Sequence, residues 1–351
     1  MVMDEYLKNG ARILVIKLSA MGDVVHTFPV VAAVKKARPD ISLDWVVAEG
    51  YRELVGLSRH VDNVILFKRK EWGSFWKPGV LSQISGFLRN VREKEYDAVV
   101  DLQGLLRSGL ITAAARSPLK IGFDYAREGA TLFYNRKIGR PPGQVHAIER
   151  YLGALKEIGI PFQGGPDYGI SVPQRETLWA ETVTPKEPFA VVNPNARWKT
   201  KRWSAEKFAG LVKELEKRHG MRSVIIGGPD DVKTGAQLAS MAGPAAMDLT
   251  GKGGFAHLAA LLGRAAVMFT NDSGPMHLAV ALNIPVVAVF GPTNPNLTGP
   301  YGPGNMVVAA SVDCSPCYKR ECEKGMECMD SISVESVLTA WNATAKAGAR
   351  R

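Results

Sequence analysis

The sequence RILVIKLSAMGD at residues 12–23 decides the fold class of the chain. A mostly apolar run leads into small and polar residues, and a second apolar segment follows. This order predicts a strand over Arg12–Leu18, a loop and then a helix. Pro29 is tolerated in the first turn of a helix but breaks its interior, so we expect the helix over about residues 27–37. Asp23 is then expected on the loop at the carboxyl end of the strand.

Strands and helices alternate outward from this unit in both halves of the chain. In the first half we expect strands at residues 43–48, 64–67 and 97–102 and a helix at 81–94. In the second half we expect strands at residues 189–193, 223–226, 266–270 and 285–290, a helix between Ser204 as N-cap and Gly220 as stop, and a last helix at 334–347. Such alternation predicts a parallel, doubly wound α/β sheet in each half. The Pro- and Gly-rich stretch Ile160–Pro188 is too irregular for a core element and is expected to link the two.

The length and composition agree with two globular domains. The chain has 351 residues, of which 46% are hydrophobic and 22% charged, so it is neither disordered nor fibrous. No apolar run approaches the ~18 to 20 residues that cross a bilayer, and the first residues lack the layout of a signal peptide, so we expect a cytoplasmic protein. The net charge of +10 favours an anionic partner such as phosphates, nucleic acid or a membrane surface.

Four polar segments follow predicted strands, where open parallel sheets bind their ligands. They are SAMGD at 19–23, NPNARWKTKRW at 193–203, GGPDD at 227–231 and TNDSGPMH at 270–277. In the last of these a helix is expected to begin near Pro275, and its free backbone N–H groups suit a diphosphate. The alternative is that Asp272 or Ser273 caps this helix and His277 faces the core.

The other two segments of the second half offer cations and carboxylates. Lys199, Lys201 and Arg202 either reach the same diphosphate or form a solvated surface. Asp230 or Asp231 is placed to accept hydrogen bonds from ribose hydroxyls. The chain has neither G-x-G-x-x-G nor G-x-x-x-x-G-K-[ST], which argues against a nicotinamide dehydrogenase and against a P-loop enzyme.

All four cysteines lie in a short cluster, Cys314, Cys317, Cys322 and Cys328. Three interpretations stay open for them: reduced structural thiols, a structural zinc site with four thiolate ligands, and disulfides. The spacing is tighter than in common zinc modules.

These motifs together resemble, nearly end to end, the bacterial lipopolysaccharide heptosyltransferases of glycosyltransferase family nine. The first half is most similar to heptosyltransferase I, through KLSAMGDVVHTFP at 17–29, DWVVAEG at 44–50, YDAVVDLQGLLRSGLI at 96–111, LFYNRK at 132–137 and HAIER at 146–150. The motifs of the second half are more similar to those of heptosyltransferase II. They are KRW at 201–203, TNDSGPMHLAVAL at 270–282 and FGPTNP at 290–295. Because the acceptor-side half is expected to set specificity, type I is favoured.

The resemblance implies a GT-B architecture, in which two Rossmann-like domains face each other across a cleft. Residues 1–175 would bind the acceptor, residues 176–332 the nucleotide sugar, and residues 333–351 would form a helix that crosses back to the N-terminal domain. The implied reaction moves heptose from ADP-heptose to a Kdo residue of Kdo-lipid A with inversion and without a metal or other cofactor. Peripheral association with the cytoplasmic face of the inner membrane follows from that acceptor.

The resemblance also assigns roles to residues. Asp23 matches the general base, Lys201 the lysine on the diphosphate, Asp272 the aspartate near the sugar, and Asp231 the acid on the ribose. The remaining donor-binding candidates are Asn195, Arg197, Ser273, Gly274 and His277. The acceptor-binding candidates, expected to meet carboxylates and phosphates, are Arg69, Lys70, Arg107, Arg127, Arg136 and Arg150.

Two positions depart from the type I pattern. Gly253 stands where a methionine adjoins adenine, and Ala196 and Arg197 replace a pair of threonines. These departures lie on the donor side and leave adenine recognition open. The first alternative is a family member that acts on another acceptor, such as the heptosyltransferase II type, or that uses another nucleotide sugar. A basic nucleic-acid-binding protein is an alternative of another class, but no helix-turn-helix, aromatic sheet motif or zinc finger supports it, so we expect no nucleic-acid partner.

Overall fold

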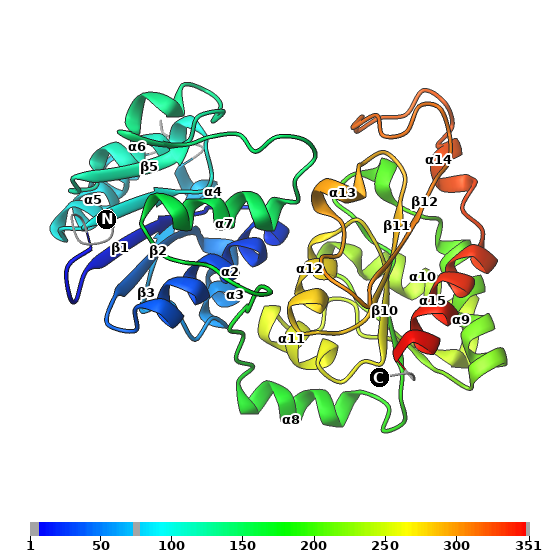
Figure 1. The fold of residues 1–351 in the computed structure, drawn as a ribbon. Coiled ribbons are helices and arrows are strands. Elements are labelled where there is room, and N and C mark those ends of the chain that lie inside the picture. Colours follow the sequence, from blue (N-terminus) through cyan, green and yellow to red (C-terminus); the bar gives the residue numbers. More distant parts are fainter. Residues whose placement is uncertain (1–6, 73–77, 349–351) are drawn as a thin grey trace. The chain divides into compact units, whose positions relative to one another are not determined.

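The computed structural model describes residues 7–72 and 78–348, and the chain divides into two compact units, Met1–Ser171 and Val172–Arg351 (Figure 1). Each unit is built on one six-stranded sheet. All paired strands run parallel, which requires a crossover between them, and helices supply most of these crossovers. The α/β class with a parallel sheet in each half is confirmed.

The first sheet has the strand order β3-β2-β1-β4-β5-β6, so the order reverses between β1 and β4. Its strands are β1 (Arg12–Ile16), β2 (Ser42–Ala48), β3 (Asn63–Phe67), β4 (Ala98–Asp101), β5 (Leu119–Phe123) and β6 (Arg136–Ile138). Its helices are α2 (Met21–Ala37), α3 (Arg52–Gly56), α4 (Arg69–Trp72), α5 (Val80–Glu93), α6 (Leu106–Ala114) and α7 (Ala147–Glu157), with short 3-10 turns η1 (Glu49–Tyr51) and η2 (Ala130–Phe133). The carboxyl ends of β1 and β4 therefore form the position at which such sheets bind ligands.

Helix α2 begins earlier than the sequence predicted. It starts at Met21 instead of near Thr27, so Asp23 lies in the first helical turn and the prediction that it sits on a loop is wrong. The start is fixed locally, because the Asp23 carboxylate accepts a hydrogen bond from the backbone N–H of Ala20 at 3.1 Å. Pro29 lies inside the helix. Its local cost is offset because α2 is buried along most of its length and packs on α7.

The second sheet has the order β12-β11-β10-β7-β8-β9. Its strands are β7 (Ala190–Asn193), β8 (Ser223–Ile225), β9 (Ala246–Asp248), β10 (Val267–Asn271), β11 (Val286–Phe290) and β12 (Met306–Ala309). Its helices are α8 (Gln174–Val183), α9 (Ala205–His219), α10 (Val232–Ala242), α11 (Phe255–Leu262), α12 (Gly274–Ala281), α13 (Pro295–Thr298), α14 (Glu327–Asp330) and α15 (Val334–Gly348), with 3-10 turns η3 (Lys199–Lys201), η4 (Pro229–Asp231) and η5 (Gly243–Ala245). Figure 1 shows α9, α10 and α15 on one face of this sheet and α11 and α12 on the other.

Two helices of the second unit test the sequence predictions in opposite ways. Helix α9 is confirmed with both ends, since the Ser204 hydroxyl accepts from the N–H of Lys207 and Gly220 has a φ of +60°. Helix α8, in contrast, lies within the stretch that we expected to be irregular. It packs on α11 and buries Ala180 completely, so a tertiary contact stabilises a helix that the local composition did not indicate.

The last helix, α15, packs on the sheet of the second unit. Its main packing contacts are with β12, β11 and α9, all within the second unit. Val337 and Leu338 are buried in that core, and the Trp341 ring meets Phe269 edge-to-face at 6.1 Å. Its apolar face is therefore satisfied by the sheet of its own unit.

Candidate active site

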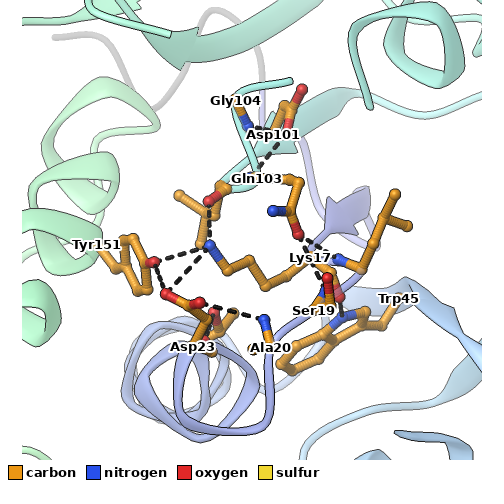
Figure 2. A network of polar contacts seen from close by, with 12 residues as sticks. Lys17, Ser19, Ala20, Asp23, Trp45, Asp101, Gln103, Gly104 and Tyr151 are labelled. Atoms are coloured by element: carbon orange, nitrogen blue, oxygen red, sulfur yellow. Dashed lines mark hydrogen bonds and ion pairs between the residues drawn. The ribbon is translucent and has the colours of Figure 1, made fainter. Parts of the chain in front are cut away.

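Asp23 lies where β1 ends and α2 begins, and its two carboxylate oxygens have different partners. Oδ2 accepts from the N–H of Ala20, which is the helix-capping contact. Oδ1 accepts from the Tyr151 hydroxyl at 2.6 Å and lies 3.6 Å from Nζ of Lys17 (Figure 2). The side chain stays 41% exposed. Asp23 thus caps α2 and also presents an anchored, solvent-accessible carboxylate.

Lys17 is the buried cation of this network. Its Nζ donates to the carbonyl of Leu102 at 2.7 Å and to the Tyr151 hydroxyl at 2.7 Å. Burial lowers the pKa of Lys17, and the negative charge of Asp23 opposes that effect. Burial and the Asp23 carboxylate both raise the pKa of Tyr151 well above its ordinary value, so this hydroxyl remains a donor.

Gln103 and Asp101 hold the backbone on which Asp23 depends. Oε1 of Gln103 accepts from the N–H groups of Leu18 and Ser19, both at 3.0 Å, and thereby fixes the loop after β1. Asp101 accepts from the N–H of Gln103 at 2.8 Å and from the Tyr134 hydroxyl at 2.7 Å. Burial raises the pKa of Asp101 although these hydrogen bonds oppose the shift. Figure 2 shows the loops after β1 and β4 joined through these contacts.

The predicted acceptor-binding cations are spread over the first unit. Arg150, next to Tyr151 on α7, acts electrostatically on Tyr125 and on Lys17. Arg107 lies half-buried on α6, whereas Arg127 is exposed. Arg136 forms an ion pair with Glu157 at 2.7 Å. The residues Arg69 and Lys70 open α4, and their side chains lie outside the described part of the structure. Of this set, the structure places Arg150 in the network around Asp23.

In the second unit Lys201 and Asp272 form a closely paired, largely buried couple. Nζ of Lys201 lies 2.5 Å from Oδ2 of Asp272, and the hydroxyl of Thr293 donates to the same oxygen at 2.6 Å. Lys201 also lies over the Trp198 ring, 4.6 Å from its centroid. The pairing of these two predicted residues joins the segment after β7 to the segment after β10.

The start of α12 carries no side-chain cap. Ser273 is the N-cap residue, but its hydroxyl bonds to the Thr270 hydroxyl at 3.0 Å and accepts from Nδ2 of Asn193 at 2.9 Å. Asp272 is engaged by Lys201, so the alternative in which Asp272 or Ser273 caps the helix is wrong. Gly274 is the first helical residue and His277 is buried on the same helix. The first turn of α12 therefore has no side-chain cap and begins next to the paired residues Lys201 and Asp272, and a helix start of this kind can bind an anion.

Asn195, Arg197 and Asp231 surround the same edge of the sheet. The side chain of Asn195 is buried, and neither of its polar atoms has a hydrogen-bond partner among the described residues. Asp231 accepts from the N–H of Gly228 at 2.9 Å, and Arg197 is exposed. A Cβ on Gly227 would come within 2.8 Å of Asp231 and 3.1 Å of Asn195, so only glycine fits there.

Gly253 is fixed by its own surroundings. It has a φ of +87°, and a Cβ at this position would meet the His257 ring at 2.4 Å. The His257 ring packs edge-to-face on Trp179 of α8, 4.7 Å between centroids. A methionine therefore does not fit at position 253, and the space beside it is taken by the imidazole of His257.

The four cysteines line one cavity of about 80 Å³, together with Thr200 and Pro292. All four are free thiols. Within residues 7–72 and 78–348, no group of three or more His, Cys, Asp or Glu side chains is arranged to hold a metal ion. A zinc site is therefore not preformed at this cluster.

Several residues of the two sites were not predicted from the sequence. Lys17, Gln103 and Tyr151 support Asp23, while Asn193 and Thr293 support the α12 start. The one available signal is Lys17 itself, a lysine at the end of an otherwise apolar strand segment.

The comparisons with known proteins agree with this geometry. The model for glycosyltransferase family 9 (heptosyltransferase) matches residues 84–327. The chain belongs to glycosyltransferase family 9. It is 32% identical to lipopolysaccharide heptosyltransferase 1 of Pseudomonas aeruginosa, over 89% of this chain and 87% of that protein. It is also 32% identical to lipopolysaccharide heptosyltransferase 1 of Escherichia coli K12, over 85% of this chain and 93% of that protein.

Solved structures of the family share the fold. This family 9 chain is similar to the E. coli heptosyltransferase WaaC with ADP, with a TM-score of 0.79, 29% identity, and coverage of 95% of this chain and 99% of that one. The E. coli ADP-heptose lps heptosyltransferase II gives a TM-score of 0.75 at 22% identity and covers 95% and 98%, which supports the fold alone. The GT-B fold class and the assignment as a glycosyltransferase are confirmed.

No helix in the described ranges has both the length and the apolar character needed to cross a bilayer.

Proposed function

We propose that this family 9 enzyme transfers heptose from ADP-heptose to a Kdo residue of the lipopolysaccharide inner core, with Kdo-lipid A as acceptor. The observation that carries the proposal is the pair of sites: an anchored, exposed carboxylate in the first unit and a lysine beside an uncapped helix start in the second. The relatives named heptosyltransferase 1, and the WaaC structures with ADP and with ADP-2-deoxy-2-fluoro heptose, support the donor and the reaction.

The donor end of the reaction needs positive charge. The bond between the anomeric carbon and the diphosphate breaks and ADP leaves with its negative charge. Lys201 and the N–H groups at the start of α12 would stabilise that charge, with Asp272 holding the lysine in place. Asn195 has unused hydrogen-bonding capacity at this edge, and Ser273, Gly274, His277, Arg197 and Asp231 complete the proposed donor site, Asp231 toward the ribose.

The acceptor end needs a base. As the acceptor oxygen attacks the anomeric carbon, its proton passes to the Asp23 carboxylate, and attack opposite to the departing diphosphate inverts the configuration. The predicted cations of the first unit suit Kdo carboxylates and lipid A phosphates, and Arg150 acts electrostatically on Lys17 and Tyr151 beside Asp23. The excess positive charge of the chain favours binding at an anionic membrane surface, the cytoplasmic face of the inner membrane.

The test is a direct transfer assay. The protein is incubated with ADP-heptose and Kdo-lipid A, with and without EDTA, and the lipid product is analysed by mass spectrometry. We expect one added heptose at the same rate in both samples. In the proposed mechanism a lysine and a helix start stabilise the departing diphosphate, and no metal ion is needed for this. A product only with heptosyl-Kdo-lipid A as acceptor would contradict the type I specificity, and loss of product in EDTA would contradict the metal-independent mechanism.

A further inference from the structure

The two groups that contact Oδ1 of Asp23 come from distant parts of the sequence. Lys17 follows β1 and Tyr151 lies on α7, 134 residues later. The Tyr151 hydroxyl accepts from Lys17 at 2.7 Å and donates to Asp23 at 2.6 Å, so it connects the ammonium to the carboxylate. Figure 2 shows the side chains of Lys17 and Tyr151 both directed toward Asp23.

Lys17 is a buried cation that forms an ion pair with Asp23. Its side chain is only 4% exposed, and its one ion pair among the described residues is with Asp23. A buried ammonium group is costly unless it is paired and hydrogen-bonded. The Leu102 carbonyl and the Tyr151 hydroxyl satisfy its hydrogen bonds, and Asp23 supplies the opposite charge. An ionised Asp23 and a protonated Lys17 therefore stabilise each other.

A second trio of the same residue types lies in the same unit and shows what is particular to the first. Asp44 accepts from Tyr96 at 2.9 Å and from Lys94 at 2.7 Å. Asp44 is completely buried, whereas the Asp23 side chain is 41% exposed. The Asp44 trio can only be structural. In the Asp23 trio the lysine and tyrosine are buried and the carboxylate faces outward, where it can receive a proton.

We propose that Lys17 and Tyr151 are positioning residues that hold the Asp23 carboxylate in one orientation and in its ionised form. This inference rests on the proposed function, in which Asp23 is the base. Hydrogen bonds and an opposite charge both favour the carboxylate over the carboxylic acid. With both groups in place, Asp23 stays ready to accept a proton at lower pH than an unassisted carboxyl in the same position.

Other titratable groups act on this trio from each neighbouring element. Arg150 and Tyr125 interact with Tyr151, and Asp101 from β4 acts on Lys17. His26 of α2 and His146 before α7 lie edge-to-face near this trio, with 5.3 Å between their ring centroids. A pH profile of activity alone therefore mixes several groups, so the test also follows the Asp23 carboxyl directly.

The test compares Tyr151→Phe with Tyr96→Phe. Both substitutions remove one buried hydroxyl that donates to a carboxylate paired with lysine, but only the first touches Asp23. For Tyr151→Phe we expect turnover at pH 7 to fall at least about threefold and the acidic limb of the pH profile to move up by about half a unit to one unit. Carbon-13 NMR of the aspartate carboxyl groups should show the Asp23 titration midpoint moving by the same amount. Tyr96→Phe should leave both unchanged.

A second variant removes the charge. Lys17→Met nearly keeps the length of the side chain but removes the positive charge beside Asp23. The acidic limb of the pH profile and the NMR titration midpoint of Asp23 should therefore both move up by about one pH unit or more. Unmoved midpoints in folded Tyr151→Phe and Lys17→Met proteins would overturn the proposal, as would lower turnover with an unmoved acidic limb. If the NMR midpoint moves while Asp23→Asn remains active, the positioning stands and the assignment of Asp23 as base fails.

Discussion

At the scale of single residues, Asp23 combines two tasks that a mutation can separate. One carboxylate oxygen caps α2 through Ala20, and the other is bound by Tyr151 beside the ammonium of Lys17. Asparagine caps a helix nearly as well as aspartate, but it cannot act as a base and does not carry the charge that pairs with Lys17.

We expect Asp23→Asn to fold, to bind ADP-heptose with near-normal affinity, and to lose at least about a hundredfold in turnover. Its stability should fall by about 1 to 3 kcal/mol because Lys17 loses its counter-charge, less than for a fully buried pair since Asp23 is partly exposed. Calorimetric titration with the donor, single-turnover kinetics and urea unfolding measure the three quantities. Turnover within about threefold of the parent would place the base elsewhere, with His26 as the next candidate.

The sequence predicted the position of Asp23 between a strand and a helix but not its partners. Tyr151 is 128 residues away from Asp23, and Asp101 stabilises the loop only through Gln103. Such contacts depend on which strands become neighbours, here β1 and β4, and local patterns carry no information on that pairing. Lys201 and Asp272 were predicted separately from their segments, and only the fold shows that they pair.

At the scale of elements, the helices and strands with the clearest local sequence patterns were the ones predicted. Helix α9 was predicted with both ends because a serine cap, an amphipathic repeat and a terminal glycine coincide. The strands β5, β6, β9 and β12 were not predicted. Three of them, β6, β9 and β12, are edge strands whose residues are mostly not buried, so they lack the buried apolar run that marks the central strands.

The segment that carries the cysteines allows a prediction of its own. Cys317 and Cys322 are exposed, Cys314 is half-buried and Cys328 is buried. Burial raises the pKa of the Cys328 thiol, and the three neighbouring thiols add to this, so it forms the reactive thiolate least readily. We expect timed alkylation of the native protein, read by peptide mass spectrometry, to modify Cys317 and Cys322 first and Cys328 last, with rates at least about tenfold apart.

The same experiment decides between the interpretations of this cluster. A zinc ion held by four thiolates would protect all four cysteines until a chelator is added, and disulfides would protect them until a reductant is added. Either pattern would contradict the prediction of free thiols with graded reactivity. Denatured protein supplies the control, because all four cysteines should then react at similar rates.

At the scale of the whole molecule, the two units place their candidate sites at the same position of the sheet. Each carries its candidate site beyond the carboxyl ends of the central strands, after β1 in the first unit and after β7 and β10 in the second. That location was predicted from the alternation of strands and helices together with the polar segments between them. The pattern alone did not predict which unit binds the acceptor and which binds the donor, because both halves have the same sheet order.

The units differ in how their stability should respond to alkaline pH. The first contains three buried tyrosines that each donate to a carboxylate, Tyr96 to Asp44, Tyr134 to Asp101 and Tyr151 to Asp23. Burial raises the pKa of all three, and the neighbouring carboxylate adds to the shift.

Because the folded unit keeps these hydroxyls protonated while the unfolded chain releases their protons near pH 10, their contribution to stability is complete below about pH 10 and is lost as the pH rises further. Each tyrosine contributes a slope of up to about 1.4 kcal/mol per pH unit. Burial lowers the pKa of Lys17 and of Lys120, which opposes this trend, but three tyrosines outweigh two lysines. Raising the pH from 9 to 11 should therefore lower the melting temperature of the first unit more than that of the second, as measured by calorimetry with hydrogen exchange to assign each transition. Tyr96→Phe should reduce the dependence of the unfolding free energy on pH by the contribution of one tyrosine, up to about 1.4 kcal/mol per pH unit. Equal shifts of both transitions, or a greater shift of the second, would show that these tyrosines do not govern the alkaline limit.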